Sequence, residues 1–124
     1  MEIHFKTIPH KKHRYDTVGD YFMNGKVWEF RVSDMKNDDY EFLVLMHELV
    51  EAYLCKKRAI SWKKIDEFDK EYEKNRKKGD FSECGDSKDA PYYQEHQFAT
   101  DIEKQIADEL DVSWKNYEKS INNL

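Results

Sequence analysis

A histidine and two glutamates lie inside an otherwise apolar stretch of this chain, LVLMHELVEAYL, at positions 43–54. On a helix with about 100° per residue, His47 and Glu51 fall at the centre of the apolar face. Glu48 lies about a quarter-turn to the side of His47. Burying a lone ionised carboxylate costs several kcal/mol, so Glu51 needs a partner that offsets its charge.

A second stretch repeats the pattern. In YYQEHQFATDIEKQIADEL, at positions 92–110, His96 and Glu103 share one face with alanine, isoleucine and leucine side chains. Two predicted helices therefore each bring one histidine and one glutamate to a core-facing side. This coincidence is the main sign of a functional site in the sequence.

Two kinds of compensation are open to these residues. They can form a hydrogen-bonded network with no ion, or they can share a divalent cation. Two histidines and one carboxylate with an open fourth position are typical of catalytic zinc, which makes zinc the predicted ion and His47, Glu51 and His96 its predicted ligands. Glu103 is expected to accept a hydrogen bond from a ligating histidine, or to replace it as ligand. Glu48 is the predicted general base.

The composition narrows the class of protein. At 124 residues the chain is long enough for a single domain, and its aromatic content of 15% supplies large core side chains. A net charge of −5 argues against general nucleic-acid binding. No run approaches the roughly 18 apolar residues that span a bilayer, and no signal peptide is recognisable. Two cysteines are too few for a disulfide framework, so we expect reduced thiols and a cytoplasmic protein without a membrane partner.

Residues 1–36 are predicted to form strands. Asn24-Gly25 is a strong hairpin signal between two runs rich in aromatic and β-branched residues, at 20–23 and 27–33. On the second strand, one face is expected to be buried, and it carries Trp28, Phe30 and Val32.

The rest of the chain is predicted to be helical. We expect a central helix at 38–57, a surface helix at 61–77, a loop at 78–91, a helix at 92–110 and a short C-terminal helix at 113–124. The fold class is therefore α+β, with a small N-terminal antiparallel sheet packed against three to four helices.

Polar side chains are also predicted to cap three of the helices, and charged side chains are predicted to form the exposed face of the helix at 61–77. The expected N-caps are Asp38 or Asp39, Ser61 and Ser113. The acidic run DEFDKEYEK, at 66–74, is expected to be a solvated helix face.

The strand VWEFRVSDM followed by HELVE resembles a minimal zincin. This resemblance implies a strand, a helix bearing HExx(H/E), and a third metal ligand on a later helix. Zincins carry a second histidine where this chain has Glu51. About four-fifths of the chain, from GDYF to DVSW, also resembles small phage and prophage proteins, a resemblance that implies no established activity.

Three functions are compatible with these residues. The first is a divalent-metal-dependent hydrolase acting on a peptide or another small substrate. The second is an all-helical nucleotide pyrophosphohydrolase that holds Mg²⁺, for which Glu48 and Glu51 would form the ExxE half of the motif. The third is a phage-type accessory protein that binds a host protein or a signalling nucleotide without catalysis. Metal content and metal identity discriminate among the three.

Overall fold

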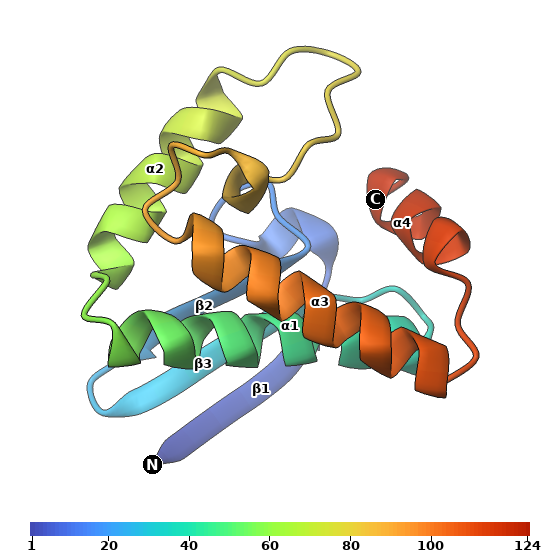
Figure 1. The fold of residues 1–124 in the computed structure, drawn as a ribbon, viewed down its shortest axis with the longest axis horizontal. Coiled ribbons are helices and arrows are strands. Elements are labelled where there is room, and N and C mark those ends of the chain that lie inside the picture. The colour runs from blue at the N-terminus through green and yellow to red at the C-terminus, as the bar shows by residue number, and fades with distance from the viewer.

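The computed structural model describes residues 1–124 as a small sheet covered by helices (Figure 1). This confirms the predicted α+β class. Two short 3-10 segments, η1 (His10–Lys12) and η2 (Cys84–Asp86), interrupt the loops. The strands and helices, in chain order, are β1 (Glu2–Ile8), β2 (Gly19–Asn24), β3 (Val27–Ser33), α1 (Asp38–Lys57), α2 (Trp62–Lys74), α3 (Tyr93–Glu109) and α4 (Trp114–Asn122).

The predicted hairpin joins β2 and β3, which pair in antiparallel fashion with Asn24 opposite Val27. Gly25 adopts a φ of 62° at the first position of the two-residue turn, a conformation that glycine reaches without strain. The strand order is β1-β3-β2, and β1 runs parallel to β3. The prediction of a wholly antiparallel sheet is therefore wrong. The segment from Pro9 to Val18 connects the end of β1 to the start of β2 on the other side of β3. The strands β1 and β2 therefore lie on either side of β3 and run in opposite directions.

The helix caps follow the predictions with one exception. Ser61 accepts a hydrogen bond from the N–H of Lys63 at the start of α2, and Ser113 caps α4 in the same manner. At α1 the cap is Asn37, one residue earlier than predicted, because its side chain accepts from the N–H of Tyr40. An amide oxygen at this position satisfies an N–H that the helix leaves unpaired.

The helix α1 is central, as predicted, because it lies between the sheet and α3 (Figure 1). Trp28, Phe30 and Val32 on β3 form the buried face of the sheet, as predicted. The apolar core consists of two clusters, one containing Leu43 and Val44 of α1 and the other containing Ala52 and Cys55. The helix therefore carries its polar residues His47 and Glu51 between two apolar ends. No helix of this fold combines the length and apolar character that crossing a membrane requires.

Candidate metal centre

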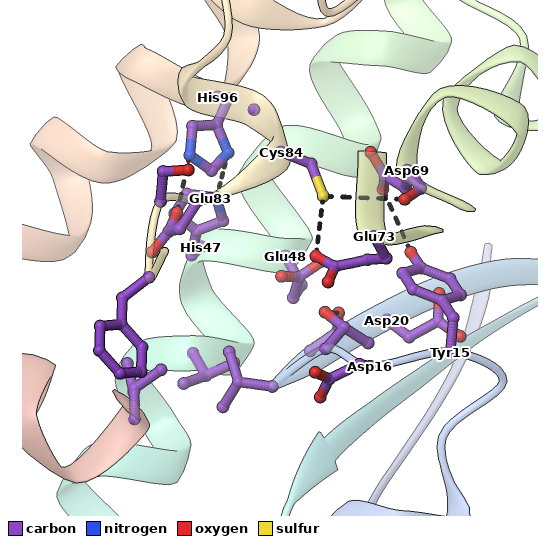
Figure 2. Close-up of a pocket in the computed structure, with 18 of the residues that line it drawn as sticks. Tyr15, Asp16, Asp20, His47, Glu48, Asp69, Glu73, Glu83, Cys84 and His96 are labelled. Atoms are coloured by element: carbon purple, nitrogen blue, oxygen red, sulfur yellow. Dashed lines mark hydrogen bonds and ion pairs between the residues drawn. The ribbon is translucent and has the colours of Figure 1, made fainter. Parts of the chain in front are cut away.

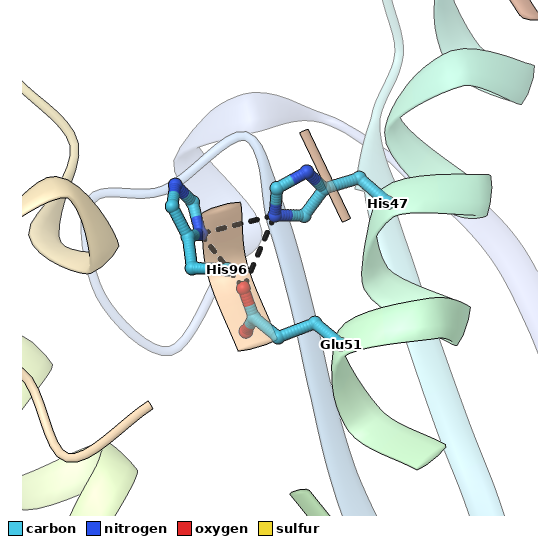
Figure 3. A group of neighbouring side chains, drawn as sticks. All are labelled: His47, Glu51 and His96. Carbon is cyan, nitrogen blue, oxygen red and sulfur yellow. Dashed lines mark hydrogen bonds and ion pairs between the residues drawn. The ribbon is translucent and has the colours of Figure 1, made fainter. Parts of the chain in front are cut away.

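Three predicted ligands converge between α1 and α3. His47 and Glu51 are one turn apart on α1, and His96 faces them from the first turn of α3 (Figure 3). His47 Nε2 lies 3.1 Å from Glu51 Oε2 and 3.1 Å from His96 Nδ1, and His96 Nδ1 lies 2.8 Å from Glu51 Oε2. The three residues are only 5 to 6% exposed. The i, i+4 spacing places the first two on one face of α1, and the packing of the two helices supplies the third.

Glu103 and Tyr21 form hydrogen bonds to two of the predicted ligands, His47 and Glu51, on the sides that face away from the centre of the cluster. Glu103 Oε1 lies 2.8 Å from His47 Nδ1, the contact that the sequence predicted for a supporting glutamate. When His47 donates its Nδ1–H to Glu103, the lone pair of Nε2 faces the centre of the cluster. The hydroxyl of Tyr21, on β2, donates to Glu51 Oε1 at 2.9 Å, which leaves Oε2 free to face the same centre. No local pattern in the sequence predicts a role for Tyr21, because its contact with Glu51 spans 30 positions.

The outer nitrogen of His96 meets the η2 segment. Nε2 is buried and lies 2.8 Å from Glu83 Oε2 and 3.4 Å from Asp86 Oδ1. Both distances are within ion-pair range, but neither contact has the geometry of a hydrogen bond. The backbone of Gly85 lies against the imidazole ring, where a Cβ would sit 2.2 Å from Cγ of His96. Glycine is therefore required at this position for η2 to approach the ring so closely.

Carboxylates raise the pKa of both imidazoles. Burial opposes a charge on His47, but the hydrogen bonds to Glu103 and Glu51 outweigh this effect and raise the pKa of His47 to about 10. Burial also opposes a charge on His96, and the carboxylates of Asp86, Glu51 and Glu83 outweigh it and raise the pKa of His96 above the ordinary value. For Glu51, burial raises the pKa, and the stronger effect of the two imidazoles lowers it.

The cluster thus favours positive charge at its centre, but it has little room for two protons. The facing nitrogens of His47 and His96 are 3.1 Å apart, so two N–H groups there would point like charges toward the same carboxylate oxygen. A single cation bound by all three atoms removes this conflict. The three atoms form a group that could hold a metal ion.

A second possible group joins the other nitrogen of His96 to Glu83 and Asp86, whose side chains are exposed. No family model, curated protein or solved structure matches this chain.

A cavity of about 550 Å³ opens beside the cluster and is lined by all three predicted ligands. Glu48, the predicted general base, also lines it. It lies between the two histidines and an acidic wall of the cavity that includes Asp20, Asp69 and Glu73 (Figure 2). A Cβ at Gly19 would come within 2.7 Å of Glu48 Oε1, so the glycine leaves room for this carboxylate. Burial, followed by the charge of Glu51, raises the pKa of Glu48 well above its ordinary value.

The acidic wall comes partly from α2 and was not predicted. Asp66 and Asp69 are buried and line the cavity, so the prediction that run 66–74 is a solvated face is wrong for these two residues. Arg14 bridges Asp66 to the β2 residue Asp20, with nitrogen–oxygen distances of 2.7 to 3.1 Å. The sequence signal that was available is the spacing of the two aspartates, three positions apart, which places them on one face of a helix.

Proposed function

We propose that this chain is a zinc-dependent hydrolase whose zinc ligands are His47, Glu51 and His96. The observation that supports it best is the triangle of ligand atoms, with sides of 2.8, 3.1 and 3.1 Å. Tetrahedral zinc with bonds of about 2.0–2.1 Å separates its ligand atoms by roughly 3.3 Å, so binding would need the triangle to open by only a few tenths of an ångström. Two imidazoles and one carboxylate are a donor set that zinc accepts.

The cavity gives such a centre access to a substrate. A three-ligand site leaves one position for water or substrate, and zinc acts there as a Lewis acid that lowers the pKa of water. Glu48 faces the same cavity from the residue next to His47, and its raised pKa makes it a stronger base than an exposed glutamate. We assign Glu48 the role of general base. Glu103 and Tyr21 keep the ligands in place.

The alternative of a Mg²⁺-dependent pyrophosphohydrolase has weaker support. Both groups of ligand atoms that could hold an ion include His96, whereas Mg²⁺ prefers oxygen ligands. Asp66 and Asp69 line the cavity together with Glu48 and Glu51, but no three of these carboxylates come close enough to form such a group. A phage-type accessory protein without catalysis remains the alternative if no metal binds.

Metal content tests the proposal. Wild-type protein, purified without chelator and then reconstituted with zinc, should contain one zinc per chain by elemental analysis. The variant His47→Ala should lose this zinc and keep most of its helical circular dichroism, because the apolar residues of α1 stay in place. His13→Ala is the matched control, because His13 bonds Ser33 and does not line the cavity. A wild type without zinc after reconstitution, or a His47→Ala variant with the wild-type zinc content, would contradict the proposed site.

Activity needs its own experiment, because the substrate class is open. We would screen a panel of fluorogenic peptides and p-nitrophenyl esters with the zinc-loaded wild type and with Glu48→Gln. The variant should keep its zinc and lose hydrolysis, since the amide cannot accept a proton. Equal hydrolysis by the two proteins would remove Glu48 from the mechanism.

A further inference from the structure

The strand β1 leaves part of the apolar sheet face uncovered. In the sheet, Ile3 lies next to Trp28 and Phe5 next to Phe30, so all four side chains point to the face that α1 covers. Trp28 and Phe30 are buried, but Ile3 is 44% exposed and Phe5 is 42% exposed. Figure 1 shows why, because β1 runs out beyond the helical layer at one border of the sheet. The apolar face thus continues past α1 into solvent.

The outer edge of β1 is also open. The strand pairs only with β3, so every second residue leaves its N–H and C=O groups without a partner in the sheet. Proteins usually protect such edges with a proline, a bulge, a very short strand or charged side chains, of which β1 has only the last, in Glu2 and Lys6. The seven residues of β1 contain neither proline nor glycine, and the first proline is Pro9, after the strand has ended.

The sequence of β1 is complementary to itself when the strand is reversed. In an antiparallel pair of two β1 strands centred on His4, Glu2 of one copy lies opposite Lys6 of the other, and Ile3 lies opposite Phe5. Each pairing occurs twice because of the two-fold axis. Opposite charges and pairs of an aromatic with a β-branched residue are both favourable across strands. In the single chain the only ion pair of Glu2 is with His4 of the same strand, and Lys6 has no ion pair.

We infer that β1 is a dimerisation edge, and that its partner is β1 of a second copy of this chain. The two three-stranded sheets then join into one continuous sheet of six strands. The four side chains Ile3 and Phe5 of the two copies cover one another between the two helical layers. No residue of β1 lines the cavity at the metal centre, so this inference does not depend on the proposed hydrolase.

Charge reversal gives a sharp test. Sedimentation equilibrium of the full chain, from micromolar to millimolar concentration, should show a reversible monomer–dimer equilibrium. Glu2→Lys and Lys6→Glu should each weaken the dimer, roughly fivefold or more, because each places like charges opposite one another at two symmetric positions. The double variant Glu2→Lys/Lys6→Glu should restore the dimer, since the swapped charges again face their opposites.

The control is Lys115→Glu, a charge reversal on α4 at an exposed position far from β1 in the sequence. It should leave the dimer constant unchanged, and circular dichroism should show the same fold for all five proteins. A wild type that stays monomeric at all concentrations would overturn the inference. So would single variants that dimerise like the wild type, or a double variant that stays as weak as the single ones.

Discussion

Replacing Asp69 by asparagine should make the protein more stable at neutral and alkaline pH. Asp69 is only 7% exposed, and its carboxylate accepts hydrogen bonds from the hydroxyls of Tyr15 and Tyr92. Burial is the main cause that raises its pKa to about 7. The hydroxyl of Tyr92 acts in the opposite direction, and the negative charge of Glu51 adds to the effect of burial.

The direction of the pH dependence follows from this raised pKa. In the unfolded chain an aspartate titrates near pKa ~3.9. Below about pH 4 both states carry the proton and the carboxyl has no net effect on stability. As the pH rises toward 7 the unfolded chain gives up the proton first, so the folded state loses stability, by roughly 4 kcal/mol once the pH exceeds 7. An asparagine cannot ionise, so Asp69→Asn should avoid most of this loss. Its oxygen can accept from one of the two tyrosine hydroxyls, and its NH2 can donate to the oxygen of the other.

Urea unfolding of metal-free protein at about pH 4, 6 and 8 measures the effect. The difference in unfolding free energy between Asp69→Asn and the wild type should be small near pH 4 and should grow to a few kcal/mol at pH 8. Asp101→Asn, on the exposed face of α3, should show no such trend. A difference that stays constant with pH would refute the raised pKa, and with it the view that α2 presents a buried, protonatable carboxyl to the cavity.

Three other substitutions test the site itself. Tyr21→Phe removes the hydroxyl that donates to Glu51, so zinc affinity should fall about 10- to 100-fold in competition with a chromophoric chelator; an unchanged affinity would show that the hydroxyl does not position the ligand. Gly85→Ala places a methyl group against the imidazole of His96, and the required shift should also weaken zinc binding at least about tenfold while the far-ultraviolet circular dichroism is retained. Metal-free Glu48→Gln should unfold at a higher urea concentration than the wild type at pH 8, because the amide replaces a buried carboxyl whose pKa is raised. Equal unfolding midpoints would show that ionisation of Glu48 does not lower the stability of the folded state.

Local signals in the sequence predicted the elements that carry the proposed ligands. Asn24-Gly25 predicted the hairpin because a two-residue turn needs a positive φ, which Gly25 adopts. Helical periodicity predicted that His47 and Glu51 face one side of α1, because side chains four positions apart lie above one another on any α-helix. The same periodicity predicted that His96 faces the core. These statements depend only on neighbouring residues, and the structure agrees with them.

Contacts between distant segments could not be predicted in this way. Nothing in residues 2–8 distinguishes a strand that pairs in parallel with β3 from one that pairs in antiparallel fashion, because both have the same alternation of side chains. The contact of Tyr21 with Glu51 depends on how the sheet lies against α1. Asp69 resembles its charged neighbours on α2, and it is buried because Tyr15 and Tyr92 reach it from two other parts of the chain.

The way in which buried charge is neutralised sets the candidate metal centre apart from the rest of the protein. Asp20 and Asp66 share the guanidinium of Arg14, a permanent cation that needs no further ligand. Glu51 and Glu103 have no lysine or arginine within ion-pair distance, and their nearest nitrogen atoms belong to two histidines. A site that only had to neutralise carboxylates could use arginine, as this chain does elsewhere. Imidazoles differ from arginine because they can give up a proton and offer a lone pair. Two such lone pairs beside a carboxylate oxygen can coordinate a metal ion. Replacing both histidines by arginine or lysine should therefore keep the charge balance and abolish zinc binding, and a zinc content unchanged by such a replacement would show that the nitrogen atoms are not ligands.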